Sequence, residues 1–161
     1  MKQLRFTAPI LVAVLFLVSC APNVSTLKAD VDAFAPLIAY EISLGHISQA
    51  NADKYTNDGK LLTDDFGQLA GAWGGNKVLA LGTFAGQVLP IANDFAKIPH
   101  LNEAMLILNT TVAILRAYYG GTPPKIVTGA SASAQHVPAN DTELNKFLKD
   151  QRAKLKAALV Y

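Results

Sequence analysis

The apolar residues of the chain recur mainly at intervals of three and four, which is the period of an amphipathic helix. The most regular stretch runs from Leu101 to Tyr119, and a second one runs from Thr26 to Leu44. The apolar positions are Leu101, Met105, Leu108, Val112, Leu115 and Tyr119 in the first stretch, and Leu27, Val31, Phe34 and Ile38 in the second. Both stretches predict helices with one face turned toward a core.

Residues that disfavour or end helices occur within the helix predicted over 26–44 and directly after it. Pro36 lacks a backbone N–H, so we expect it to bend this helix or to mark an early break. Gly45 and His46 are a plausible stop, because glycine readily adopts the left-handed conformation that ends helices. Ser48 then offers a hydroxyl that could cap the next helix.

Two more helices are predicted between these stretches. Apolar residues from Tyr55 to Trp73 line one side of a segment that the sequence at 57–59, Asn-Asp-Gly, is expected to interrupt. After a Gly-Gly-Asn turn at 74–76, a bulky stripe continues to Phe95, and Pro90 is expected to kink this helix or end it early. That stripe consists of Leu81, Phe84, Val88, Ile91 and Phe95.

The C-terminal part differs in composition from the rest. Residues 120–140 are rich in Gly, Pro, Ser and Ala, which predicts a flexible, disordered linker. Residues 141–161 predict a basic amphipathic helix. That helix either packs as a fifth helix of the domain or reaches over the linker to an acidic partner or a lipid surface.

These patterns together predict one domain of the all-α class. At 161 residues with 51% hydrophobic residues, the chain can bury one core but not two. We expect a small antiparallel bundle of four or five helices, with the main helical domain at 26–119 and the disordered linker before the last helix.

The N-terminus has the layout of an export signal. Lys2 and Arg5 are followed by an apolar run at 6–18 of about 13 residues, and the small residue Ser19 precedes Cys20. A helix that spans a membrane needs roughly 20 apolar residues, so a permanent transmembrane anchor fits less well. The sequence Leu17-Val18-Ser19-Cys20 resembles the lipobox of bacterial lipoproteins.

The resemblance to bacterial lipoproteins implies a processing route. Residues 1–19 would be removed by cleavage between Ser19 and Cys20, and Cys20 would carry a diacylglycerol group and an N-acyl chain. Residues 20–25 would then be a lipidated tether. The neutral Ala21 implies sorting to the outer membrane, facing the periplasm, in a host with two membranes. The alternative is an ordinary secretory signal with an incidental cysteine.

The charge balance argues against nucleic acid as a partner. The chain has 14 basic and 12 acidic residues, and loss of Lys2 and Arg5 with the signal would leave 12 of each. Binding to phosphate backbones depends on clustered Lys and Arg, which a near-neutral chain does not supply. The expected partner is membrane lipid, through the anchor, with an envelope protein as a second candidate. The oligomeric state stays open.

No catalytic or metal-binding pattern stands out. His46, His100 and His136 fall at a predicted helix end, a turn and the linker, and none has the spacing of a metal-ligand pair. The chain has no GxSxG motif for serine catalysis. Cys20 is the only cysteine, and acylation would consume its thiol. We therefore expect no enzyme activity, no metal and no cofactor besides the covalent lipid.

Glycines spaced by four residues are the remaining candidate feature. They are Gly67, Gly71, Gly75, Gly82 and Gly86, and this spacing lets helices approach closely. They serve either close packing within the bundle or a helical hairpin, 78–92 with 104–118, that enters or perturbs a bilayer. The expected function is a non-catalytic binding or structural role at the periplasmic membrane surface. The alternative is a membrane-active accessory factor of the phage or plasmid lysis or exclusion type.

Overall fold

The structure is a computed structural model, and it describes residues 24–121 and 136–158. Within these residues all regular elements are helical, which confirms the predicted all-α class. The α-helices are α2 (Ser25–Asp32), α3 (Phe34–Ser43), α4 (Ala52–Gly71), α5 (Lys77–Phe95), α6 (Pro99–Tyr118) and α7 (Asp141–Ala158). Two short 3-10 helices, η2 (Gln49–Asn51) and η3 (Ala72–Gly74), lie on either side of α4.

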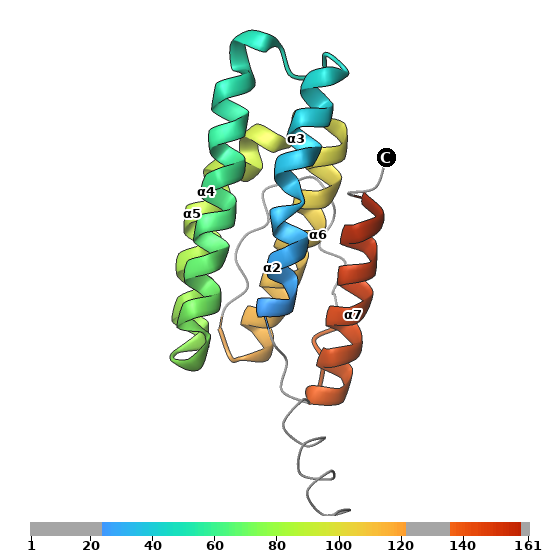
Figure 1. The fold of residues 1–161 in the computed structure, drawn as a ribbon. Coiled ribbons are helices and arrows are strands. Elements are labelled where there is room, and N and C mark those ends of the chain that lie inside the picture. The colour runs from blue at the N-terminus through green and yellow to red at the C-terminus, as the bar shows by residue number, and fades with distance from the viewer. Residues whose placement is uncertain (1–23, 122–135, 159–161) are drawn as a thin grey trace, which may run out of the picture.

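The helices form an antiparallel bundle (Figure 1). In Figure 1, α2 and α3 run upward as one interrupted rod, α4 runs down, α5 up, α6 down and α7 up. We call the end with the start of α2, the α4–α5 turn, the end of α6 and the start of α7 the lower end. The upper end holds residues 44–51 and the turn between α5 and α6.

The first rod is interrupted at Ala33, which separates α2 from α3. Pro36 explains the position of this break. Its nitrogen cannot donate to the carbonyl of Asp32, and its ring would collide with that carbonyl in a continuous helix. The expectation that Pro36 breaks the 26–44 helix is confirmed, with the break three residues before the proline itself.

Two helices end in the same motif, with a glycine at positive φ. Gly45 (φ 77°) follows α3, and Gly120 (φ 87°) follows α6. After α3, the N–H of Gly45 donates to Ile42 O (3.0 Å) and the N–H of His46 donates to Glu41 O (3.0 Å). This is a Schellman motif, which satisfies carbonyls that the helix leaves free. Gly45 is thus the stop that the sequence predicted.

The α4 helix is continuous from Ala52 to Gly71, so the interruption expected at 57–59 is wrong. Gly59 is buried, and a Cβ added there would lie 2.5 Å from Ile38 Cδ1. The glycine therefore allows α3 and α4 to approach closely instead of breaking the helix. Ser48 precedes η2 but makes no side-chain capping hydrogen bond, so its expected capping role is also wrong.

The α5 helix continues through Pro90 to Phe95, so the early end considered at Pro90 is wrong. Pro90 lies on the exposed side, while the whole predicted stripe of α5 is buried. Pro99, by contrast, is in the first turn of α6, where its missing N–H costs nothing. The stability gained by burying that apolar stripe offsets the destabilisation caused by a proline inside the helix.

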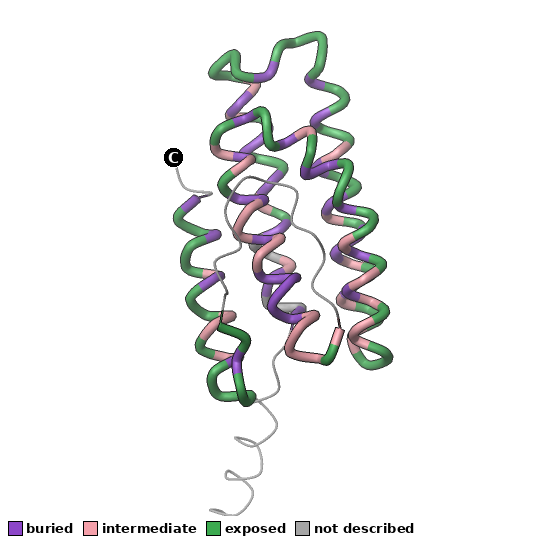
Figure 2. The backbone as a smooth tube through the Cα atoms, turned by 180° about the vertical axis from the view of Figure 1, so that it is seen from behind, coloured by how far each residue is buried: buried purple, intermediate pink, exposed green. Residues whose placement is uncertain are grey.

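The core runs the length of the bundle, and α7 belongs to it. Buried positions alternate with exposed ones along every helix (Figure 2). Leu144 and Leu155 of α7 are 0% and 2% exposed, and α7 packs against α6 and α2. Of the predicted 120–140 linker, residues 122–135 lie outside the described residues.

Candidate functional site

The upper end of the bundle contains a fully buried acidic residue. Glu41 is 0% exposed and lies on α3. It follows Ile38 by three residues, so it continues the apolar stripe of that helix. A carboxylate removed from water needs hydrogen-bond or charged partners, because burial without them costs several kcal/mol or more.

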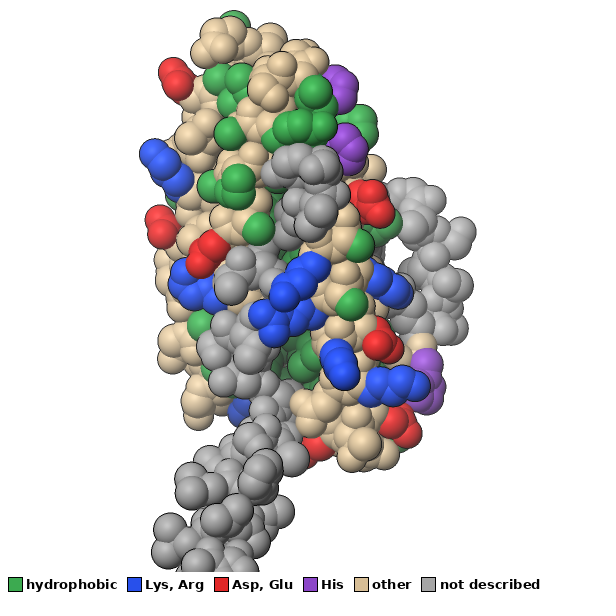
Figure 3. All heavy atoms as spheres, turned by 45° about the vertical axis from the view of Figure 1, so that its right-hand side comes forward, with side chains coloured by type: hydrophobic (Ala, Val, Ile, Leu, Met, Phe, Trp, Pro, Cys, Tyr) green, Lys and Arg blue, Asp and Glu red, His purple; other side chains and the backbone are tan. Residues whose placement is uncertain are grey.

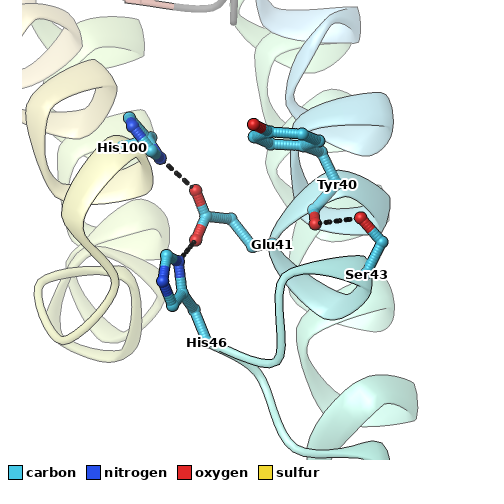
Figure 4. Close-up of polar contacts among 5 residues, drawn as sticks. All are labelled: Tyr40, Glu41, Ser43, His46 and His100. Atoms are coloured by element: carbon cyan, nitrogen blue, oxygen red, sulfur yellow. Dashed lines mark hydrogen bonds and ion pairs between the residues drawn. The ribbon is translucent and has the colours of Figure 1, made fainter.

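Two histidines supply these partners (Figure 4). Nδ1 of His46 lies 2.7 Å from Glu41 Oε2, and Nδ1 of His100 bonds to Glu41 Oε1. Each carboxylate oxygen thus has its own imidazole. The histidine side chains are 44% and 41% exposed, so the cluster connects the buried carboxylate to the surface.

Local structure places each histidine. The Schellman motif bonds the backbone of His46 to that of Glu41, which brings the His46 ring next to the carboxylate. Pro99 begins α6, so His100 lies in the first turn of that helix. The carboxylate is therefore held near the N-terminus of α6, where the helix dipole favours a negative charge. Glu41 ties α3, the following loop and α6 together.

The chemistry available to this cluster is limited in the part of the chain that the structure describes. Nearby, Ser43 Oγ donates to Tyr40 O (2.7 Å), and Figure 4 shows the Ser43 hydroxyl on the side away from the two histidines. Among residues 24–121 and 136–158, no group of three or more His, Cys, Asp or Glu side chains could hold a metal ion. The geometry is that of a polar contact that joins α3, the following loop and α6. We call Glu41, His46 and His100 together the Glu41 latch.

Sequence reasoning missed this cluster. It placed His46 at a helix end and His100 in a turn, found no metal-ligand spacing, and did not relate these two residues, which are 54 positions apart in the chain. The usable signal was Glu41, an acidic residue at a position where the helical stripe requires an apolar one. That signal predicts a buried carboxylate with partners, although it does not say which residues those partners are.

A second polar group lies where α4 begins and α5 ends. Lys54 Nζ lies 2.7 Å from Asp94 Oδ1, and this hydrogen bond raises the pKa of Lys54. Asp58 lies one turn further along α4, and its Oδ2 is buried without a hydrogen-bond partner among the described residues. Burial, followed by the negative charge of Asp94, raises the pKa of Asp58 above its ordinary value.

The predicted glycine positions lie mainly on the surface of α4 and α5. A Cβ added at Gly67, Gly71 or Gly86 would meet nothing within 4 Å, so these three do not bring helices of the bundle together. At Gly75 a Cβ would meet only the Ala72 carbonyl, and at Gly82 it would meet the Arg116 guanidinium, each at 3.5 Å. A membrane contact by these glycines stays a prediction.

Some of these glycines line a hollow at the lower end. The hollow has a volume of about 580 Å³ and lies between the end of α4 and the first half of α5. Small and apolar residues dominate its wall, and its lining includes no charged side chain: Gln68, Leu69, Gly71, Ala72, Gly74, Gly75, Asn76, Leu79, Ala80, Thr83, Phe84 and Gln87. Leu79 at its edge is 67% exposed.

An aromatic cluster lies at the same end. Trp73 and Tyr119 meet edge to face with 5.6 Å between ring centroids, and Lys77 Nζ lies 5.9 Å and 5.4 Å from these two centroids. Tyr118 packs edge to face on Tyr119 and donates a hydrogen bond to Asp141 (2.6 Å), which raises the pKa of Tyr118 to about 12. Burial raises the pKa of Tyr119 as well, so both phenols are neutral at physiological pH.

Neither the predicted lipidation residues nor the comparisons with known proteins identify a further site. Ser19 and Cys20 lie outside the described residues. In the described part of the chain, one helix, α5, is long and apolar enough to cross a membrane by length and composition alone. Comparison with protein-family models, curated proteins and solved structures finds no match to this chain.

Proposed function

We propose that this chain is a lipid-anchored protein of the cell envelope with a non-catalytic binding or structural role. The observation that carries the proposal is the position of Cys20, the only cysteine of the chain, directly after an export-signal pattern. Val24, four residues later, is already fully buried in the helical core. A folded domain that begins so soon after Cys20 supports an anchor held close to the bundle.

The shape of the bundle supports a role at the membrane surface. Because α4 and α6 each have 20 residues, the bundle is about 30 Å long. The described chain begins with α2 at the lower end, so a lipid anchor on Cys20 would hold the upper end with the Glu41 latch away from the lipid. The upper end is then the surface available to an envelope partner, at the outer membrane if the host has two membranes.

The anchor is tested by acyl labelling in cells. The protein should incorporate labelled palmitate, and Cys20→Ser should abolish the label and leave an unprocessed precursor. Ser19→Ala is the matched control, because it keeps a small residue before the cleavage site and should be labelled and processed normally. Processing of the Cys20→Ser protein to normal size would refute the lipoprotein assignment.

One observation favours a second candidate function. The α5 helix has the length and mean hydropathy of a membrane span. A membrane-active factor of the lysis or exclusion type would release α5 and α6 as a hairpin into the bilayer. That release would uncover to water the apolar side chains of α3 and α4 that now pack against α5, including Phe34 and Phe66, which favours the anchored bundle over the inserted hairpin.

A vesicle assay separates the two candidates. The version that starts at Ala21, without acyl chains, should be soluble and should not release dye from vesicles of phosphatidylethanolamine and phosphatidylglycerol. Dye release by this version, together with helical protein in the lipid fraction, would favour the membrane-active factor.

A further inference from the structure

We infer that the lower end of the bundle rests on the bilayer surface, with Leu79 entering the lipid and Trp73, Lys77 and Tyr119 at headgroup level. The inference deepens the proposed function and rests on it, because it takes Cys20 to be the anchor. It assigns a lipid-contacting surface, which we call the docking edge, to the α4–α5 turn, the first turns of α5 and Tyr119 at the end of α6.

The length of the chain between anchor and fold limits where the bilayer can be. Three residues lie between Cys20 and Val24, and the four steps along the chain span at most about 14 Å in any conformation. Val24 is fixed in the core at the start of α2, which is the lower end of the bundle. The acyl chains therefore hold that end within a short distance of the lipid, while the bundle extends about 30 Å away from it.

The side chains at the docking edge suit a membrane interface. Leu79 is the most exposed of the large apolar side chains that the structure describes, at 67%. Trp73 and Tyr119 are partly exposed, and rings of this kind are enriched at headgroup level because one part is apolar and another polar. The Lys77 ammonium lies close to both rings, and its positive charge is complementary to a lipid phosphate.

The hollow beside Leu79 adds apolar surface without charge. It opens next to the α4–α5 turn, and glycines and alanines make up much of its wall. Insertion of Leu79 would carry this uncharged wall into the headgroup layer, where a buried charge would have been costly. Contact with lipid would thus account for the exposed glycines of this turn, Gly71 and Gly75, which packing inside the bundle does not explain.

Charge distribution decides which part of the lower end faces the lipid. The start of α7 is acidic, with Asp141 and Glu143 exposed. Figure 3 shows the Lys and Arg side chains gathered over the face that includes α7, with acidic side chains toward its lower end. Anionic lipid would repel Asp141 and Glu143 at that corner, which favours the α4–α5 turn as the part of the lower end that faces the bilayer.

The test uses Trp73, the only tryptophan of the chain. The lipidated protein is reconstituted in vesicles of phosphatidylethanolamine and phosphatidylglycerol that contain lipids brominated either near the headgroup or near the chain ends. Bromine quenches indole fluorescence only at short range. Trp73 should lose emission with the shallow bromine, lose less with the deep bromine, and become less accessible to iodide than in the version starting at Ala21.

Two leucines of one helix provide the variant and its control. Leu79→Glu should reduce the quenching by brominated lipid, because a carboxylate cannot enter the interface. Leu89→Glu, at a 41% exposed position about 15 Å further up α5, should leave the quenching unchanged. Circular dichroism of both variants verifies that the helices are intact.

The outcomes separate this inference from the proposed function. Protein that floats with the vesicles while Trp73 stays open to iodide and is not quenched by bromine would overturn the docking edge and leave the anchor standing. Equal effects of Leu79→Glu and Leu89→Glu would also overturn it. Protein that carries no acyl chain when isolated from membranes would refute the anchor itself.

Discussion

Glu41 shows how one residue can connect three parts of a small bundle. It occupies a core position of α3, yet it is stabilised by His46 from the next loop and by His100 from α6. Its carboxylate is 0% exposed, so the two imidazoles are its main compensation for lost hydration. The stability of the upper end should therefore depend on these polar contacts as well as on apolar packing.

Removing both imidazoles should be costly. The double variant His46→Ala, His100→Ala leaves a buried carboxylate without its partners and should lower the free energy of unfolding by about 3–5 kcal/mol. Urea denaturation followed by circular dichroism measures this change. Adding Glu41→Leu to the double variant should recover most of the loss, since an apolar side chain suits the site. A double variant as stable as the parent would show that the latch contributes nothing.

Asp58 should make stability depend on pH in the opposite sense to most carboxylates. Burial raises its pKa in the folded state above the ordinary 3.8, so its stabilising contribution is present below that value and is lost as the pH rises through the folded-state pKa. Asp58→Asn should thus raise Tm at neutral pH and give little benefit near pH 3. Calorimetry at both pH values checks this, and a benefit of equal size at both would contradict it.

At the scale of elements, glycines have different roles according to their surroundings. Gly59 and Gly67 both lie inside α4, eight residues apart. A side chain at Gly59 would meet Ile38 Cδ1 at 2.5 Å, whereas one at Gly67 would meet nothing within 4 Å. The first glycine leaves room for the Ile38 side chain between α3 and α4, and the second only weakens its helix.

Alanine substitutions should separate these roles. Gly67→Ala should stabilise by about 0.5–1 kcal/mol, because alanine loses less backbone entropy in a helix. Gly59→Ala should destabilise, because overpacking costs about 1–3 kcal/mol and exceeds that gain. Thermal unfolding measures both.

A further substitution on α3 tests the contact itself. Ile38→Val removes Cδ1, so the variant with Ile38→Val and Gly59→Ala together should be more stable than the sum of the single effects. Additive effects of the two substitutions would show that Gly59 and Ile38 are not in close contact.

The helices themselves were largely predictable from the sequence, because their apolar stripes repeat every three or four residues. The stops at Gly45 and before Pro99 also followed from local backbone chemistry. The errors at Gly59 and Pro90 share a cause, since the intrinsic cost of either residue in a helix can be outweighed by packing of the rest of that helix. Neighbouring helices overrode the local preference at both places.

At the scale of the whole molecule, the bundle has two different ends. One end carries the aromatic and glycine-rich docking edge, and the other carries the Glu41 latch. Sequence patterns predicted an antiparallel bundle, but they could not predict either end. Each end assembles residues that lie far apart in the chain, such as Trp73 with Tyr119, and only the packed topology brings them together.

The most direct measurement of the lipid anchor is the mass of the mature N-terminal peptide. Protein extracted from membranes and digested with trypsin should yield a peptide that begins at Cys20 and ends at Lys28, with added mass from a diacylglycerol group and an N-acyl chain. A peptide that joins residues 6–19 to an unmodified Cys20, or a mature N-terminus at another residue, would contradict the anchor.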